Sequence, residues 1–79
     1  MPWYVYILKC NDEHLYTGCS ENISERIKRH EDGGVPATKE RLPIKLISYT
    51  VFGDKCKAFT FEKYLKSGSG RAFISKHYL

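Results

Sequence analysis

Residues 3–9 read Trp-Tyr-Val-Tyr-Ile-Leu-Lys (WYVYILK), and the other predicted elements are arranged around this stretch. It is rich in aromatic and β-branched side chains, which favour a β-strand. Apolar residues occupy both its odd and its even positions, so both faces of the strand must be covered. We therefore predict a central strand here.

Two further strands are predicted beside it. The polar stretch Asn11-Asp12-Glu13 is a turn, and residues 14–18 (HLYTG) follow it as the second strand of a hairpin. Residues 44–52 (IKLISYTVF) are predicted to form the third strand. If the residues paired in the hairpin have numbers that add up to an even sum, Tyr6 and Tyr16 share one face as diagonal neighbours.

The first helix is predicted from its ends. Asn22 can cap its N-terminus, with Glu25 three residues later as in a capping box, and Gly33-Gly34 ends it. Residues 33–43 contain two prolines and are predicted to be a loop.

Two more helices follow the third strand. One is predicted over residues 55–66 and ends at the break formed by residues 68–70. Ser69 then caps a short last helix that extends to about His77. The order ββαβαα predicts an α/β fold with a small three-stranded, mainly antiparallel sheet flanked by helices.

Composition limits the class of protein. The 79 residues suffice for a single domain, which we expect to span residues 1–79, and 42% of them are apolar, which excludes intrinsic disorder. The sequence contains no run of 18 apolar residues and no signal-peptide pattern. The three cysteines form no C-x-x-C pair and are expected to be reduced thiols. We expect a cytoplasmic protein that is a monomer and does not contact membranes.

Charge is distributed unevenly along the chain. Residues 1–32 carry four Lys/Arg and six Asp/Glu, whereas residues 55–79 carry six Lys/Arg and only Glu62. A polyanion is therefore expected to bind the C-terminal third. The residues that we expect to contact it are Arg26, Arg29, Lys63, Lys66, Arg71 and Lys76.

Three polar residues fall at the edges of apolar helix faces. Arg26 and His30 flank the stripe of the first helix, where Arg26 can extend over the rim of the core and His30 can be an ordinary interfacial histidine. Glu62 borders the stripe of the second helix. It can be a salt-bridge partner, which the residues alone favour, or a ligand for a hard cation such as Mg²⁺.

Taken together, these residues resemble the GIY-YIG nuclease superfamily over essentially the whole chain. Tyr4-Val5-Tyr6 stands at the first motif of that family and Tyr16-Thr17-Gly18 at the second. Residues 22–30 resemble its arginine helix and residues 62–66 its glutamate helix. Residues 66–73 resemble the small bacterial members, and the N-terminal domain of the repair protein UvrC is a further relative.

The resemblance implies a metal-dependent endonuclease that hydrolyses phosphodiester bonds. Glu62 would bind one divalent ion, Mg²⁺ or Mn²⁺, and Arg26 would contact the phosphate. Tyr6, Tyr16 and His30 are the candidates for positioning or deprotonating the attacking water, and the choice among the three stays open. One departure is Cys19, which stands where UvrC-like members have a lysine that contributes to the site.

DNA is the expected substrate, with a role in repair or recombination, and RNA remains an alternative. No base-reading element is visible in the sequence, so we expect specificity to come from a protein partner or from DNA shape. Two alternatives stay open. The chain could be a nucleic-acid-binding module with little or no cleavage, or a structural or protein-interaction domain that keeps these residues as relics of the fold.

Overall fold

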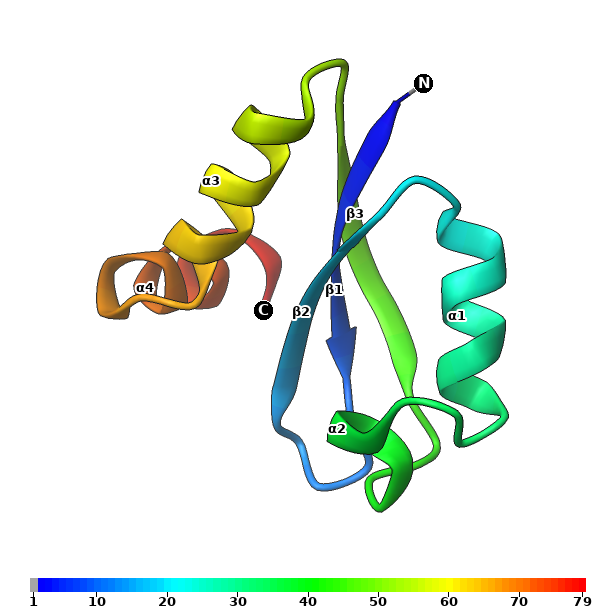
Figure 1. Cartoon of the computed structure of the whole chain (residues 1–79). Coiled ribbons are helices and arrows are strands. Elements are labelled where there is room, and N and C mark those ends of the chain that lie inside the picture. The colour runs from blue at the N-terminus through cyan, green and yellow to red at the C-terminus, as the bar shows by residue number, and fades with distance from the viewer. Residues whose placement is uncertain (1) are drawn as a thin grey trace.

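A computed structural model describes residues 2–79 and shows a three-stranded antiparallel sheet in the order β2-β1-β3 (Figure 1). The predicted central strand is confirmed as β1. The elements in chain order are β1 (Trp3–Lys9), β2 (Leu15–Ser20), α1 (Ile23–Glu31), α2 (Pro36–Lys39), β3 (Lys45–Phe52), α3 (Lys55–Leu65) and α4 (Gly68–Tyr78).

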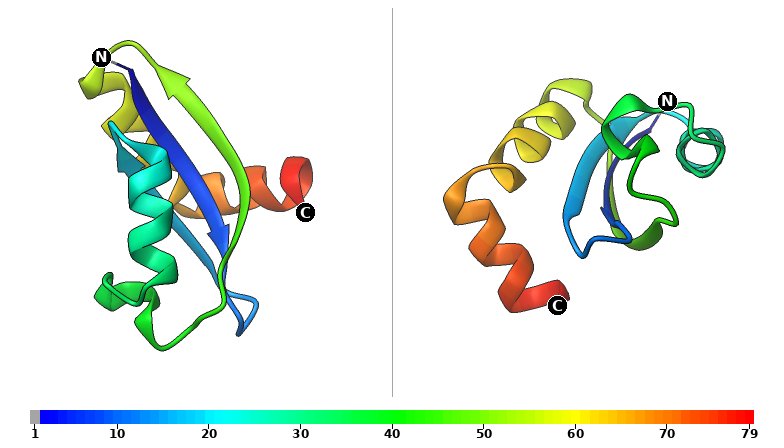
Figure 2. Two further views of the ribbon diagram at one scale, coloured as in Figure 1. Left: turned by 90° about the vertical axis from the view of Figure 1, so that its right-hand side faces the viewer. Right: turned by 90° about the horizontal axis from the view of Figure 1, so that it is seen from below.

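Helices cover both faces of this sheet. Figure 2 shows α3 and α4 on one side of the strands and α1 and α2 on the other. The resulting three-layered body measures 30 × 29 × 17 Å. The predicted fold class is confirmed, including the order ββαβαα once the short α2 is set aside.

The two faces of β1 serve different layers. Val5 and Ile7 point to one face and join a core that includes Ala58 and Leu65 of α3. Tyr6 and Leu8 alternate with them and are buried on the opposite face. A strand that is buried on both faces must be apolar at every position, and this explains the continuous WYVYILK pattern.

The hairpin register decides on which faces of the sheet the two tyrosines lie. Tyr6 pairs with Gly18 and Leu8 pairs with Tyr16, so the numbers of paired residues add up to an even sum. Tyr6 and Tyr16 therefore lie diagonally on one face, and their ring centroids are 6.3 Å apart. The strand β2 extends two residues beyond the predicted end, to Ser20.

The helix caps confirm the first prediction and correct the last. The side chain of Asn22 accepts a hydrogen bond of 3.1 Å from the backbone N–H of Glu25. The cap of α4 is Ser67 and not Ser69, because the Ser67 hydroxyl accepts from the backbone N–H of Gly70. Residues 68–70 thus form the first turn of an 11-residue helix and not a break before a short one.

The predicted loop over residues 33–43 is also wrong in part, because it contains α2. Pro36 stands at the start of this helix, where its fixed φ and missing N–H are compatible with helical structure. The prediction treated the prolines as breaks. This correction affects the site, because α2 carries the buried residue Thr38.

Two expectations from composition can be compared with the structure. Within residues 2–79, no helix is long and apolar enough to cross a membrane. Cys10, Cys19 and Cys56 are all free thiols, as predicted.

Gly70 allows α4 to cross α3 at close range. A Cβ at this position would overlap the carbonyl oxygen of Tyr64 and the Cα of Leu65, both of which belong to the backbone of α3. We expect Gly70→Ala to lower the free energy of unfolding by about 2 kcal/mol or more, because backbone atoms must shift. Urea denaturation measures this change.

Gly68 provides the matched control in the same helix. A Cβ at Gly68 meets no atom within 4 Å. Gly68→Ala should therefore leave stability unchanged or raise it by about 0.5–1 kcal/mol, because alanine favours the helix. Equal effects of the two substitutions would contradict the close crossing.

Candidate functional site

Four of the five predicted catalytic residues gather on the face of the sheet covered by α1. Tyr6 comes from β1 and Tyr16 from β2, while Arg26 and His30 come from α1, one turn apart. The ring of His30 lies 5.7 Å from the Tyr6 ring and 5.0 Å from the Tyr16 ring, measured between centroids. The three rings and the guanidinium thus form one cluster.

Tyr6 is the buried centre of this cluster. Its hydroxyl oxygen lies 3.0 Å from Nε2 of His30, and neither side chain is exposed to solvent. The strand partner of Tyr6 is Gly18, and a Cβ at that position would overlap the phenol oxygen and Cζ of Tyr6. The glycine of the second motif is therefore explained by the space that the Tyr6 phenol occupies.

The second nitrogen of His30 is also engaged. Its Nδ1 lies 2.7 Å from the hydroxyl oxygen of Thr38, which is fully buried in α2. The structure therefore supports part of the simpler interpretation, in which His30 is a satisfied interfacial histidine. The sequence pattern does not point to Thr38 as a site residue, because Thr38 lies in the stretch that is predicted to be a loop.

Burial raises the pKa of Tyr6 to about 12, with a smaller contribution from the neighbouring Tyr16. The Arg26 guanidinium acts in the opposite direction, and the Glu62 carboxylate adds slightly to the rise. The phenol is therefore un-ionised near neutral pH. A Tyr6 that takes a proton from water must pass its own proton on at the same time.

His30 is un-ionised as well. Burial and then the positive charge of Arg26 lower its pKa from the ordinary value of 6.5. The imidazole is therefore neutral near pH 7, with one nitrogen that donates and one that accepts.

Glu62 comes from α3, on the other face of the sheet. Its side chain is 20% exposed, and its Oε2 lies 3.4 Å from Nζ of Lys66. Its charge raises the pKa of Tyr6 and, after burial, the pKa of the Cys19 thiol, while Arg26 lowers the latter. Both charges thus act on Cys19, on the edge strand β2.

The donor set at Glu62 can be compared with what Mg²⁺ requires. Residues 2–79 contain no group of three or more His, Cys, Asp or Glu side chains placed to hold a metal ion. Mg²⁺ commonly uses one or two carboxylates together with waters and substrate phosphates. The single carboxylate of Glu62, with Oε2 engaged only by an exposed lysine, fits an ion of this kind.

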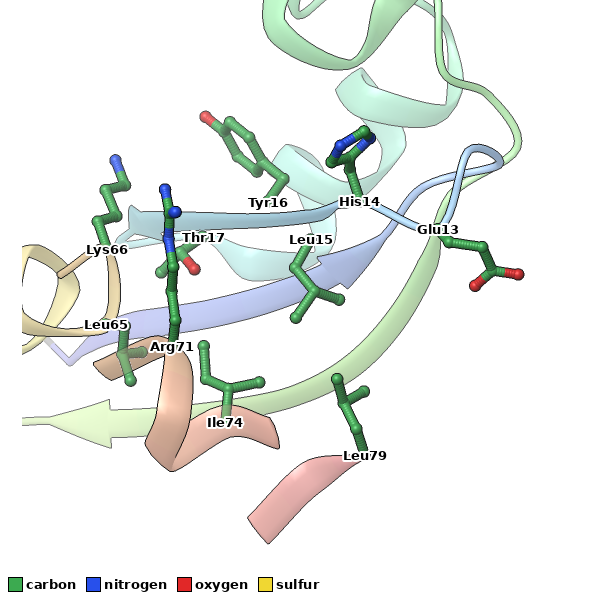
Figure 3. Close-up of a pocket in the computed structure, with 10 residues that line it drawn as sticks. All are labelled: Glu13, His14, Leu15, Tyr16, Thr17, Leu65, Lys66, Arg71, Ile74 and Leu79. Carbon is green, nitrogen blue, oxygen red and sulfur yellow. The ribbon is translucent and has the colours of Figure 1, made fainter. Parts of the chain in front are cut away.

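The predicted nucleic-acid-binding residues divide into two groups. Lys66 and Arg71 line a cleft of about 480 Å³ between β2 and α4, with Leu15 and Ile74 among its apolar walls. Figure 3 shows both cationic side chains extending beside β2 in the same direction as Tyr16. They therefore extend the positive charge of the site along the sheet edge.

The remaining cations lie outside the cleft. Arg29 is exposed on α1, and its Nη2 lies 3.9 Å from Glu25. Lys63 and Lys76 are exposed on α3 and α4. The structure does not bring these three side chains to the tyrosine cluster.

Gly18 offers a test of the Tyr6 packing. We expect Gly18→Ala to lower the free energy of unfolding by about 1–3 kcal/mol, because the added methyl group displaces a buried phenol. Gly53→Ala is the control, since a Cβ at Gly53 meets nothing within 4 Å. Chemical denaturation of the two variants should separate them, and equal stability would contradict this packing.

His30 makes stability depend on pH. Because its pKa is lowered in the folded protein, the unfolded chain binds more protons as the pH falls below 6.5. The free energy of unfolding should therefore decrease from about pH 7 to about pH 5, as measured by urea titrations.

The decrease should be smaller in His30→Gln, because glutamine takes up no proton in this range. Asp12, whose pKa is also lowered, acts in a separate window near and below 3.8. Stability that does not change between about pH 7 and pH 5 would contradict a buried neutral His30.

Comparisons with known proteins show the family to which the chain is similar. The model of the GIY-YIG catalytic domain matches residues 2–77. A UPF0213 protein of Clostridium perfringens is 48% identical over 64 residues, which cover 80% of this chain and 69% of that protein. A UPF0213 protein of Streptococcus agalactiae is 35% identical over 81 residues, covering 98% of this chain and 92% of that one.

A solved structure shows the same fold. The solution NMR structure of a UPF0213 protein from Bacillus halodurans superposes with a TM-score of 0.62 at 34% identity, covering 96% of this chain and 84% of that one. Sequence and fold agree, and the chain belongs to the GIY-YIG family, with UPF0213 proteins as its relatives.

Proposed function

We propose that this protein is a divalent-metal-dependent endonuclease that hydrolyses phosphodiester bonds in DNA. Membership of the GIY-YIG family supports a nuclease-type function. The observation that carries the finer proposal is the cluster of Tyr6, Tyr16, Arg26 and His30 at a sheet edge that the charge of Glu62 also reaches. Candidate proton acceptors, a cation and a carboxylate are the groups that metal-dependent phosphodiester hydrolysis would need.

The roles follow from the chemistry of each side chain. Arg26 is half-buried and permanently charged, so it can bind the phosphate oxygens and stabilise the charge that develops on them. Tyr16 is half-buried beside Tyr6 and His30, where its hydroxyl can orient a water molecule. Tyr6 and His30 together can accept the proton of that water, since they are hydrogen-bonded to each other.

Glu62 is the residue that would hold the metal ion. When bound, Mg²⁺ or Mn²⁺ would polarise the scissile phosphate and stabilise the leaving oxygen. The Glu62–Lys66 ion pair is between i and i+4 at the end of α3, where Lys66 is exposed and Glu62 is partly buried, and helix pairs of this spacing contribute only about 0.3–0.5 kcal/mol. Lys66 can therefore release the carboxylate and contact a DNA phosphate instead.

The DNA strand is proposed to follow the edge of β2. Lys66 and Arg71 lie along this edge beside the site, and phosphate contacts from such cations provide affinity without reading sequence. Arg29, Lys63 and Lys76 are exposed and would contact phosphates farther from the cleaved bond. Any sequence or branch preference would then come from DNA shape or from a protein partner.

The proposal predicts that cleavage requires the carboxylate of Glu62. We expect Glu62→Gln to lower kcat by about 10²-fold or more with Mg²⁺ or Mn²⁺, because glutamine has the same shape but no charge to hold the ion. The measurement is cleavage of labelled duplex, single-stranded, flap and four-way-junction DNA, with EDTA as the metal-free arm.

Glu13→Gln is the matched control, since Lys9 and Glu13 form the same kind of i,i+4 ion pair at 2.7 Å in the hairpin. It should cleave like the wild type. Full activity of Glu62→Gln would contradict the metal assignment. DNA binding that persists in EDTA, with no cut product on any substrate, would favour a nucleic-acid-binding module instead.

A further inference from the structure

We propose that Thr38 is a positioning residue that holds His30 in the tautomer protonated at Nδ1, so that Nε2 can receive the proton of Tyr6. This inference rests on the proposed hydrolytic function. It adds a residue from α2 to a site that otherwise comes from the strands, α1 and α3.

The three side chains form a continuous hydrogen-bonded row from three elements. Tyr6 of β1 contacts Nε2 of His30 at 3.0 Å, and Nδ1 of the same ring contacts Thr38 of α2 at 2.7 Å. All three side chains are buried, so bulk solvent does not compete for these two hydrogen bonds. In residues 2–79, no buried side-chain nitrogen or oxygen lacks a hydrogen-bond partner.

A neutral imidazole has a hydrogen on only one of its two nitrogens, and the hydrogen-bond partners of the two nitrogens decide which one carries it. The phenol of Tyr6 is a much stronger acid than the alcohol of Thr38, which favours the phenol as donor and the alcohol as acceptor. The positive charge of Arg26 lowers the pKa of Tyr6, which also favours the phenol as donor. The phenol hydrogen is then directed to Nε2, and Nδ1–H donates to Thr38.

This arrangement defines a balanced proton route. As the water oxygen bonds to phosphorus and the bond to the leaving oxygen breaks, the water proton passes to the Tyr6 oxygen and the Tyr6 proton passes to Nε2. The imidazolium donates from both nitrogens, to Tyr6 and to Thr38. The leaving oxygen takes a proton from solvent, and the imidazolium returns its own through Tyr6 after product release.

The opposite tautomer would block this route. With hydrogen on Nε2, the imidazole can only donate to Tyr6, and the phenol has no acceptor in the row. A buried phenol that cannot lose its proton is a poor base, since burial already disfavours its ionised form. Thr38 therefore affects the reaction without touching the substrate.

The test compares Thr38→Val, which keeps the shape but removes the hydroxyl, with Thr38→Ser, which keeps the hydroxyl. On the DNA that the wild type cleaves best, we expect Thr38→Val to lower kcat about 10²-fold with little change in KM. Thr38→Ser should restore most of the rate. A purely structural role would not distinguish the two in this way at equal folded fraction, which circular dichroism verifies.

A second readout does not depend on cleavage. The ¹⁵N shifts of the histidine rings report which nitrogen carries hydrogen, and His30→Gln identifies the His30 signals. We expect protonated Nδ1 and unprotonated Nε2 in the wild type and in Thr38→Ser, and a change of this pattern in Thr38→Val.

The outcomes separate this inference from the proposed function. A wild type with hydrogen on Nε2, or a Thr38→Val variant that keeps both its ¹⁵N pattern and its kcat, would overturn the role of Thr38. If the wild type cleaves no DNA, the proposed function fails, and the ring shifts alone decide whether Thr38 sets the tautomer. If Thr38→Val does not fold, the wild-type tautomer and the rate of Thr38→Ser decide.

Discussion

The site depends on the hydrogen bond between the buried phenol of Tyr6 and His30. A phenol hydroxyl without solvent needs a partner inside the protein, because an unpaired buried polar group costs about 1–3 kcal/mol. His30 supplies that partner from α1 at 3.0 Å, and Thr38 satisfies the other ring nitrogen from α2. The hydrogen bonds of Tyr6, His30 and Thr38 thus join α1 and α2 to the sheet, and the same three side chains would transfer protons in the proposed reaction.

The alternation of β1 connects this row to the hydrophobic core. Val5 and Ile7 pack against α3 and α4, while Tyr6 between them points to the other layer. A shift of the strand by one residue would exchange the two sets, so the core that fixes the register also orients the phenol. Gly18 completes the arrangement, since its missing side chain leaves the space that the phenol fills.

Charge is added to this neutral row at one edge of the sheet. Arg26 approaches from α1 and Glu62 from α3, and both act on the pKa values of Tyr6 and Cys19. Because β2 is an edge strand, side chains from the two helical layers can meet around it. The basic side chains of Lys66 and Arg71 continue along the same edge, where a phosphate backbone has room to bind. The thiol of Cys19 packs against the core, and burial raises its pKa, so it adds no charge near neutral pH.

Local patterns in the sequence determined the strands, the caps at Asn22 and the order of the elements, because periodicity and capping are properties of neighbouring residues. The register of the hairpin does not follow from the sequence pattern, since the turn is compatible with two registers and packing selects one of them. The residues Tyr6, Tyr16, Arg26, His30 and Glu62 were identified by their resemblance to a family, and their convergence needed the tertiary structure. Thr38 shows the limit most clearly: it lies eight residues beyond His30 in a stretch with two prolines, and its polar side chain has no periodic signal. Only the packing of α2 against α1 brings its hydroxyl to Nδ1, because a hydrogen bond between distant segments depends on the whole fold and not on either segment alone.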